Sequence, residues 1–251
     1  LTPQSWHLFA IFVATIVGFI TQPIPIGGVS IVVITVAALT GTLKISEGIS
    51  GFANSAIWLI VGAFLFSRGF IKTGLGKRIA YNLISAFGSS SLRLAYALAL
   101  SDLILAPATP SNTARVGGVI MPITTSLAKA FGSEPQDGPR KIGSFLMQSI
   151  YQVNTITSAM FQTSMAGNTL VAALALQSFG IGITWGDWAM AAIVPGIIAL
   201  IIMPYFIYKV YPPEIKDARE AQQMIREELK GLGKMSFQEW VMLGVFVLAL
   251  V

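Results

Sequence analysis

The chain has 251 residues, of which 54% are hydrophobic and 11% charged, and its mean hydropathy is +0.73. Soluble domains carry about 25% charged residues, so this composition indicates an integral membrane protein that sits in a lipid bilayer. The basic residues flank apolar segments and form no single stripe, so the net charge of +5 is typical of cytoplasmic loops and excludes nucleic-acid binding. Cysteine is absent, which excludes thiolate metal sites, and the single histidine, His7, argues against a histidine proton relay.

Apolar stretches follow one another along the whole chain. The alternating pattern of membrane barrel strands is absent, so we expect helices, which satisfy their own backbone groups in lipid. The stretches cover residues 5–21, 26–43, 56–71, 94–128, 142–186, 188–208 and 237 to the end. The sequence Gln22-Pro23-Ile24-Pro25 joins the first two as a tight hairpin, because a proline disfavours helix in the residue before it.

Two of these stretches are too long for a simple span. The stretch 94–128 has 35 residues, and the uncharged stretch 142–186 has 45, which would be roughly 67 Å as one helix at 1.5 Å per residue. Cytoplasmic loops are enriched in lysine and arginine. If 94–128 is a re-entrant hairpin and 142–186 crosses once as a broken helix, thirteen of the sixteen basic residues share one face: Lys72, Lys77, Arg78, Arg93, Lys129, Arg140, Lys141, Lys209, Lys216, Arg219, Arg226, Lys230 and Lys234.

This topology leaves Lys44 on the opposite face and places Arg68 and Arg115 within the apolar zone. It also puts Leu1 on the outer face with no charged residue before the first helix, so we expect a preceding transmembrane helix that this chain lacks. The end, VMLGVFVLALV, stops within an apolar helix that has barely begun. We therefore interpret the chain as a fragment of a longer carrier. Residues 214–234 read EIKDAREAQQMIREELKGLGK and predict a polar, solvated or membrane-surface linker helix.

Residues 106–115 read APATPSNTAR and form the predicted hairpin tip. Pro107 and Pro110 end the first helix, and Ser111, Asn112 and Thr113 are residue types that cap the start of a new one. A half-helix that begins inside the membrane points free N–H groups and a partial positive charge ahead of it, which favours a carboxylate or phosphate. The alternative is a kinked, capped helix whose Gly117 and Gly118 permit close packing.

The companion break is expected in residues 162–169, QTSMAGNT, where Gly167 and Asn168 tolerate the backbone angles of an unwound segment. Hydroxyls and carbonyls there are suited to a hard cation or to substrate. The alternative is a polar helix-packing seam that includes Gln148, Gln152 and Asn154.

Three segments carry a resemblance to a known family: PSNTAR in the hairpin, the preceding IWLIVGAFLFSRGFIKTGLGKRIA and the later SAMFQTSMAGNT. They resemble the N-terminal repeat of the divalent anion/sodium symporter family. Within it, the chain is most similar to the exchanger branch of plastid 2-oxoglutarate/malate translocators and bacterial citrate/succinate or tartrate/succinate antiporters. The resemblance covers essentially the whole chain.

The resemblance implies an all-α membrane protein that is one half of an inverted-repeat, elevator-type carrier and works as a homodimer. Each repeat contributes a hairpin tipped by S-N-T, and the two tips hold a di- or tricarboxylate. Ser111, Asn112 and Thr113 would be the first clamp, and the second S-N-T motif, absent here, would come from a C-terminal repeat. In symporter members a Na+ site would recruit Ser111, Asn112 and residues near Thr163, Ser164, Gly167 and Asn168.

An arginine at membrane depth is by default a functional residue with a partner. Asp102 and Arg115 fall at similar depths on the two arms of the hairpin, so one hypothesis is a structural ion pair. The other is that Arg115 replaces the bound sodium ion, so that the empty carrier cannot return without another anion and must exchange. Neutralisation by Asp102 weakens the second hypothesis.

The predicted domains are scaffold-type transmembrane helices with an interfacial helix in residues 1–90, then a transport domain made of the re-entrant hairpin (91–131) and the broken helix with its following span (142–208). A cytoplasmic polar linker helix (209–236) and the start of the next transmembrane helix (237–251) complete the chain.

The predicted function is dicarboxylate exchange across a bacterial inner membrane, or a plastid inner envelope. The alternatives are sodium-coupled symport and an anion channel, and no cofactor beyond Na+ is expected. An enzyme is not expected, because Asp102 alone offers neither a nucleophile with a base nor a metal cluster, and no HExxH or GxSxG motif occurs.

Overall fold

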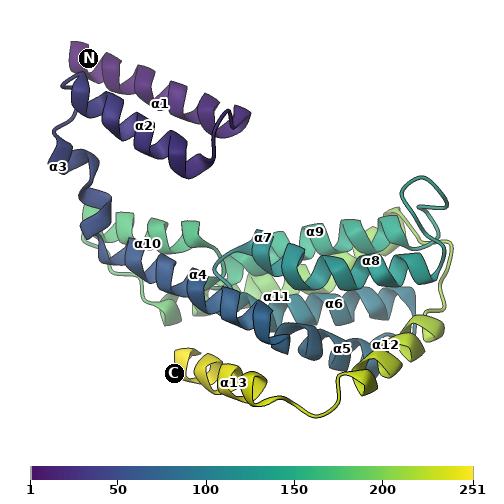
Figure 1. Ribbon diagram of the computed structural model, residues 1–251. Helices are drawn as coiled ribbons and strands as arrows, with labels where there is room; N and C mark the ends of the chain where they lie inside the picture. The colour runs from purple at the N-terminus through teal and green to yellow at the C-terminus, as the bar shows by residue number, and fades with distance from the viewer. Residues whose placement is uncertain (1, 251) are drawn as a thin grey trace. The chain divides into compact units, whose positions relative to one another are not determined.

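The computed structural model describes residues 2–250 and divides into two units, which meet between Trp58 and Leu59 (Figure 1). Leu1, assigned above to the outer face, and Val251 lie outside the described residues. Over residues 2–250 the regular structure is helical, and the extended backbone forms only an isolated bridge between Ser90 and Asp217. The predicted all-α fold is confirmed.

The first unit is a helical hairpin followed by two short turns. α1 (Pro3–Thr21) and α2 (Ile26–Leu39) pack together, then come α3 (Ile45–Gly48) and the 3-10 helix η1 (Ser50–Ala53). Gln22 ends α1 in the left-handed conformation at φ 45°, and Pro25 begins α2, which confirms the tight turn expected from the prolines. The helices approach closely at Gly18, where an added Cβ would lie 3.0 Å from Val29.

The second unit begins within α4 (Ser55–Thr73), which meets α5 (Leu75–Phe87) at a bend of 59°. Gly74 provides the bend at φ 81°, a conformation that favours glycine. α5 buries one face, which includes Ala80, Tyr81 and Ile84, and exposes the other.

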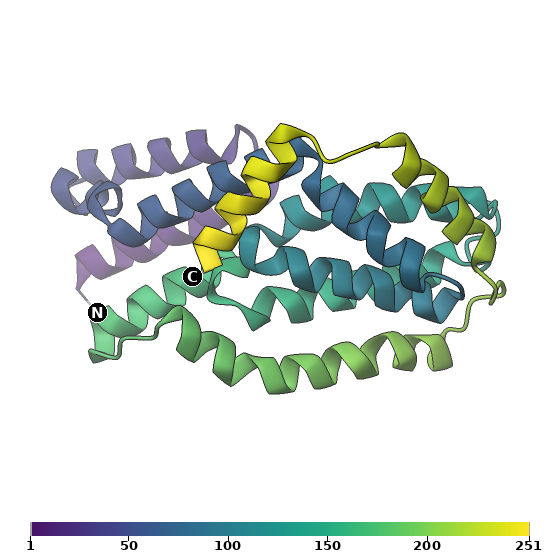
Figure 2. The ribbon, with the colours of Figure 1, turned by 90° about the horizontal axis from the view of Figure 1, so that it is seen from below.

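The re-entrant hairpin consists of α6 (Ser91–Leu105), the 3-10 helix η2 (Ala106–Ala108), and a continuous helical arm made of α7 (Asn112–Arg115), the π-helix η3 (Val116–Ile120) and α8 (Met121–Ala130) (Figures 1 and 2). Helix therefore stops and restarts where the proline pair predicts. Pro122 lacks an N–H, and the wider π turn before it accommodates the missing i to i−4 hydrogen bond. Gly118 lies in this turn, where an added Cβ would be 3.0 Å from Ile71.

The long stretch after the hairpin is a broken helix. α9 (Gly143–Met160) ends before the 3-10 helix η4 (Gln162–Ser164), and α10 (Ala166–Phe179) follows. The prediction that Gly167 and Asn168 are unwound is wrong, because both lie in the first turn of α10 with ordinary helical backbone. The break is confined to residues 161–165, where Phe161 and Met165 are extended.

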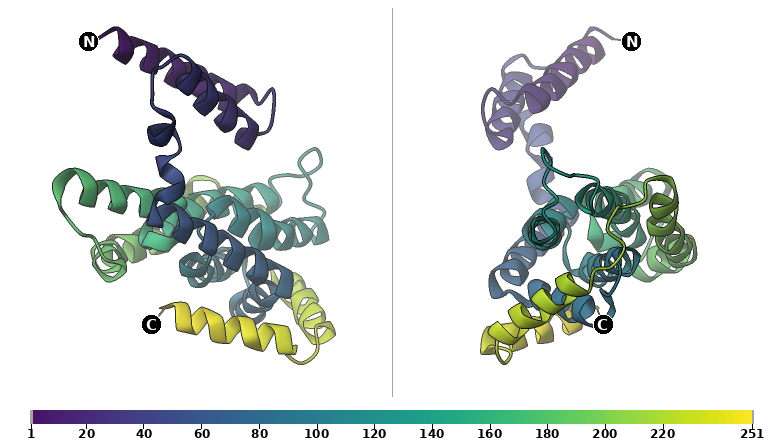
Figure 3. Two further views of the ribbon diagram at one scale, coloured as in Figure 1. Left: turned by 60° about the vertical axis from the view of Figure 1, so that its left-hand side comes forward. Right: turned by 90° about the vertical axis from the view of Figure 1, so that its right-hand side faces the viewer.

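α11 (Trp185–Val210), the long green helix of Figure 2, returns alongside α9. The linker after it differs from the prediction: α12 (Arg219–Gly231) begins five residues later than expected, and α13 (Phe237–Leu250) follows (Figure 3). Residues 214–218 instead lie outside any helix. The backbone N–H of Arg219 donates to the Asp217 carboxylate, which starts the helix there and lowers the pKa of that exposed carboxyl.

The non-helical segment 214–218 is bonded both to the start of the hairpin and to the residues just before α9. Glu214 and Ile215 donate backbone N–H groups to the carbonyls of Arg140 and Lys141, just before α9. Ser91, at the start of α6, donates its N–H to the Lys216 carbonyl at 3.0 Å and its hydroxyl to the Ile215 carbonyl at 2.5 Å. The chain therefore enters and leaves the hairpin on the same side, as the charge distribution predicts.

The core of the second unit lies around the hairpin and the start of α9. Its fully buried side chains include Ile84, Leu94, Leu98, Leu105, Ile120, Leu127, Phe145, Leu146 and Ile225. α12 contributes Ala221 and Ile225, and its Gln222 side chain donates to the Ser85 carbonyl of α5 at 2.8 Å. The linker helix is thus packed against α5.

Three helical segments of residues 2–250 are long and apolar enough to cross a membrane: Pro3–Thr21, Ser91–Ala108 and Trp185–Val210. A fourth results if the bent pair α4–α5 counts as one span. The segment Ser91–Ala108 is 61% buried within the protein, against 22% for the α11 segment, so α6 is an interior hairpin arm and α11 a peripheral helix. The chain is an integral membrane protein.

The contact between α9 and α11 predicts a strong effect for Gly196→Ala. The new Cβ would lie 2.5 Å from the Cγ of buried Met160, so we expect the free energy of unfolding to fall by about 1–3 kcal/mol. Thermal unfolding of the purified protein in detergent measures this. Gly231→Ala is the control, since no atom lies within 4 Å of its added Cβ. Equal melting temperatures for the two variants would contradict the prediction.

Candidate functional site

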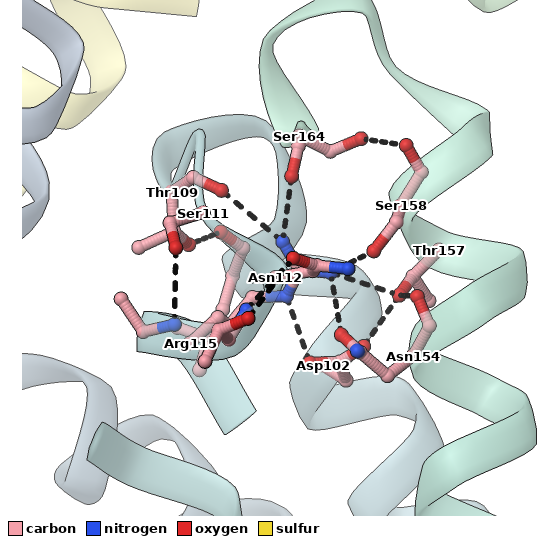
Figure 4. Close-up of polar contacts among 12 residues, drawn as sticks. Asp102, Thr109, Ser111, Asn112, Arg115, Asn154, Thr157, Ser158 and Ser164 are labelled. Carbon is pink, nitrogen blue, oxygen red and sulfur yellow. Dashed lines mark hydrogen bonds and ion pairs between the residues drawn. The ribbon is translucent and has the colours of Figure 1, made fainter. Parts of the chain in front are cut away.

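The tip of the hairpin meets the break in the long helix. Thr163 donates its hydroxyl hydrogen to the Pro107 carbonyl at 2.8 Å, and the backbone N–H of Ala166 donates to the Pro110 carbonyl at 2.9 Å (Figure 4 shows the neighbouring contacts). The two interruptions predicted separately from the sequence therefore form one site. The carbonyls freed at the tip accept hydrogen bonds from the break, which matters because lipid offers no donors.

Ser111, Asn112 and Thr113 begin the second arm of the hairpin, as predicted. Ser111 is the N-cap: its Oγ accepts from the N–H of Ala114 at 3.1 Å. The side-chain oxygen of Asn112 accepts from the N–H of Thr113 at 2.9 Å. Ser111 and Asn112 are half-buried and Thr113 is exposed. Among residues 2–250, no acceptor contacts the side-chain amide nitrogen of Asn112, which leaves that donor for a ligand.

Arg115 lies directly beneath this turn and is completely buried, with 0% of its surface exposed. One terminal nitrogen, Nη1, donates to the carbonyls of Thr109 in the tip and Ser164 in the break, at 3.1 and 3.2 Å. The other, Nη2, donates to three side-chain oxygens of α9, at 3.0 to 3.1 Å: Asn154, Thr157 and Ser158 (Figure 4). A guanidinium has five N–H donors, so the protein engages all of them.

Asp102 balances the charge of Arg115. Arg115 Nε donates to Asp102 Oδ1 at 2.8 Å, and the hydroxyl of Thr157 donates to the other carboxylate oxygen. The carboxylate is 1% exposed. The structural ion pair proposed as one role of Arg115 is therefore formed, and the site carries no uncompensated cation.

The side chains expected near a cation site are engaged in capping the end of α9. Asn168 Nδ2 donates to the carbonyls of Ser158 and Phe161, at 2.7 and 3.0 Å. Ser164 Oγ lies 2.6 and 2.7 Å from the same two carbonyls and donates its one hydrogen between them. Thr163 is bound to the tip, and Gly167 contributes no side chain. The structure brings all four residues to the break, but their side-chain donors act within the protein. Residues 2–250 hold no cluster of three acidic, histidine or cysteine side chains suited to a metal.

Sequence reasoning missed Thr157 and Ser158 and treated Asn154 only as part of a packing seam. The three lie at positions i, i+3 and i+4 of α9, so they share one face of the helix. This spacing of polar side chains in an uncharged helix is the sequence signal that could have identified them. Gln148 is exposed and Gln152 half-buried, and neither belongs to the Arg115 network.

A re-entrant hairpin that meets a broken helix within the membrane is the architecture of secondary carriers. The family model described as "Sodium:sulfate symporter transmembrane region" matches residues 1–251. The chain therefore belongs to this family, the divalent anion/sodium symporters that the sequence resembles.

Several relatives are known by name. The chain is 56% identical to "Putative malate transporter YflS" of Bacillus subtilis, with 100% of the chain and 53% of that protein aligned. It is 48% identical to the chloroplastic dicarboxylate transporter 1 of Spinacia oleracea, over 95% of the chain and 42% of that protein. It is 36% identical to the citrate/succinate antiporter of Escherichia coli, over 99% of the chain and 55% of that protein. The chain thus spans about half the length of the relatives it matches.

The Arg115 network predicts that Arg115→Gln is strongly destabilising. The change leaves the Asp102 carboxylate buried without its partner, which costs about 3–5 kcal/mol. We expect a matching loss of thermal stability, part of which is recovered by Asp102→Asn in the same protein.

The control is Arg219→Gln, which breaks the exposed pair with Asp217 and should change stability by less than about 0.5 kcal/mol. Similar stability for Arg115→Gln and Arg219→Gln would show that the buried pair is not structural.

Proposed function

We propose that this chain is one half of a secondary carrier that exchanges di- or tricarboxylates, such as 2-oxoglutarate, malate or succinate, across a membrane. The observation that carries the proposal is the accessible turn Ser111–Thr113 at the start of a half-helix, held against the broken helix by buried Arg115. The names of the relatives, which give dicarboxylates, malate and citrate/succinate, support this substrate class. Transport, rather than catalysis, is the activity that such a site serves.

A carboxylate fits this turn for electrostatic reasons. The arm from Asn112 to Ala130 is one continuous helical segment, so its positive dipole end faces the ligand. The N–H groups of Thr113 and Ala114 are already capped by Asn112 and Ser111. The Asn112 amide and the Thr113 hydroxyl add neutral donors. One such clamp holds one carboxylate, and the second clamp would come from the S-N-T motif of a C-terminal repeat.

Arg115 Nη1 supports exchange over sodium symport. It bridges the Thr109 and Ser164 carbonyls, one from each interruption, which is the place a bound cation would fill. Since Asp102 cancels its charge, Arg115 replaces the contacts of a sodium ion but not its net charge. Sodium-coupled symport, with a Na+ site at Ser111, Asn112 and the break, is the alternative.

The proposal extends to the working assembly. By family resemblance, the carrier is a homodimer in which the hairpin and broken helix move as the transport domain, elevator-fashion, against the scaffold helices of residues 1–90. A third reading is an anion channel, because half-helices also line pores. Saturation and counterflow separate a carrier from a channel.

The experiment follows labelled succinate or 2-oxoglutarate in proteoliposomes that contain the complete carrier. We expect saturable uptake that requires internal dicarboxylate and is unchanged in sodium-free buffer. Uptake into empty vesicles driven by a sodium gradient would establish the symport alternative. Flux that neither saturates nor shows counterflow would establish the channel.

The clamp predicts that Asn112→Ala weakens substrate binding. Loss of a hydrogen bond to a charged carboxylate costs about 1.5–3 kcal/mol, so KM should rise by at least about tenfold. Asn82→Ala is the matched control, because the amide of exposed Asn82 donates only to the Arg78 carbonyl of its own helix. An unchanged KM for Asn112→Ala would remove Asn112 from the clamp.

A further inference from the structure

Trp185 begins α11 and directs its indole at the unwound segment of the broken helix. Its Nε1 donates to Thr163 Oγ1 at 3.0 Å, and its ring stacks on Phe161 with centroids 5.8 Å apart and planes at 15°. A capping box fixes the start of the helix: Thr184 Oγ1 accepts from the N–H of Asp187, whose carboxylate accepts from the N–H of Thr184. The stacking on Phe161 and the fixed start of α11 therefore hold the indole in place.

The Thr163 hydroxyl passes this constraint to the hairpin tip. A hydroxyl has one hydrogen to donate. Since Thr163 accepts from Trp185, its own hydrogen is free to donate to the Pro107 carbonyl at 2.8 Å. Linked hydrogen bonds of this kind polarise and strengthen one another in a low-dielectric interior. The chain of indole, hydroxyl and carbonyl thus joins α11, the break and the tip.

This relay complements the contact made by Arg115. Arg115 joins the Thr109 and Ser164 carbonyls, whereas the relay joins the neighbouring residues Pro107 and Thr163. The tip is attached to the break at three neighbouring points, since the N–H of Ala166 also donates to the Pro110 carbonyl, and the clamp turn begins four residues after Pro107. A shift of the Pro107 carbonyl would be transmitted along this tip toward the donors at Ser111 and Asn112.

A second tryptophan nearby, Trp188, does not share the contact of Trp185 with Thr163. It lies three residues further along α11 and also donates its indole N–H to a neighbouring segment, to the Ala159 carbonyl at 2.9 Å. That acceptor belongs to the last turn of α9 and makes no contact with the tip. Anchoring at the membrane surface, a common role for tryptophan, would apply to both residues alike.

We propose that Trp185 is a positioning residue that acts through Thr163 to set the hairpin tip, and with it the affinity of the Ser111–Thr113 clamp for a carboxylate. This inference rests on the proposed function for its substrate, but not for its geometry. Trp185→Phe keeps an aromatic ring beside Phe161 and removes the N–H donor together with part of the indole, a loss of ring area that Trp188→Phe shares. One neutral hydrogen bond corresponds to a rise in KM of about threefold to tenfold, with the maximal rate unchanged.

The transport experiment compares Trp185→Phe with Trp188→Phe in the complete carrier, with succinate as the probe. Trp188→Phe should leave KM within about twofold of the original, because it removes a similar bond that does not reach the tip. Thr163→Val should raise KM and Thr163→Ser, which keeps the hydroxyl, should restore it. If Trp185 acts through Thr163, the double variant Trp185→Phe/Thr163→Val is no worse than Thr163→Val alone. Additive effects would overturn the route through Thr163.

A second measurement is independent of transport. The chain has no cysteine, so Thr113→Cys introduces a single thiol on the exposed side of the clamp. In a carrier without other cysteines, Trp185→Phe should raise the rate of maleimide labelling at this thiol, and Trp188→Phe should not. Melting temperatures confirm that each variant is folded.

The two measurements separate the two claims. Faster labelling in Trp185→Phe, in a carrier that moves no carboxylate, would sustain the positioning role and overturn the proposed transport. Unchanged labelling and unchanged KM in Trp185→Phe would overturn the positioning role and leave transport intact.

Discussion

The hydrogen bonds of Arg115 hold together the two interruptions on which the site depends. A helix that breaks within the membrane frees carbonyl groups that lipid cannot satisfy. Arg115 supplies donors to the tip at Thr109, to the break at Ser164, and to one face of α9, while Asp102 of α6 neutralises it. Two distant stretches of the chain, α6 with the tip and α9 with the break, thereby share one buried centre.

This arrangement decides how an anion would be recognised. Because all the N–H groups of Arg115 are engaged and its charge is cancelled, a bound carboxylate meets neutral donors and a helix dipole instead of a free cation. Such contacts are weaker than an ion pair, and they allow release on either side of a membrane. A carrier needs that balance, since a substrate held by an unpaired buried arginine would leave slowly.

The sequence located the interruptions correctly because prolines and capping residues act locally. Pro107 and Pro110 end one helix, and Ser111 caps the next, with no distant residue required. The role of Asn168 was misjudged because tolerance of unusual backbone angles does not require a residue to adopt them. Asn168 instead lies in the first turn of α10, from where its side chain donates to the Ser158 and Phe161 carbonyls.

Other features depend on partners far along the chain, which no local pattern contains. Residues 214–218 have the composition of a helix but are not helical, because their backbone groups bond to Arg140, Lys141 and the start of α6. The three side chains of α9 that accept from Arg115 share one helix face, yet their role as its partners is evident only once the position of Arg115 is known. In both cases tertiary contacts override local propensity.

These long-range bonds also bear on how the proposed carrier would move. The Arg115 network joins the hairpin to α9 near the tip, and residues 214–218 join the two at the opposite end. With both ends attached, the hairpin cannot tilt against α9 without breaking buried hydrogen bonds. Motion within the proposed mechanism therefore has to displace hairpin and broken helix together.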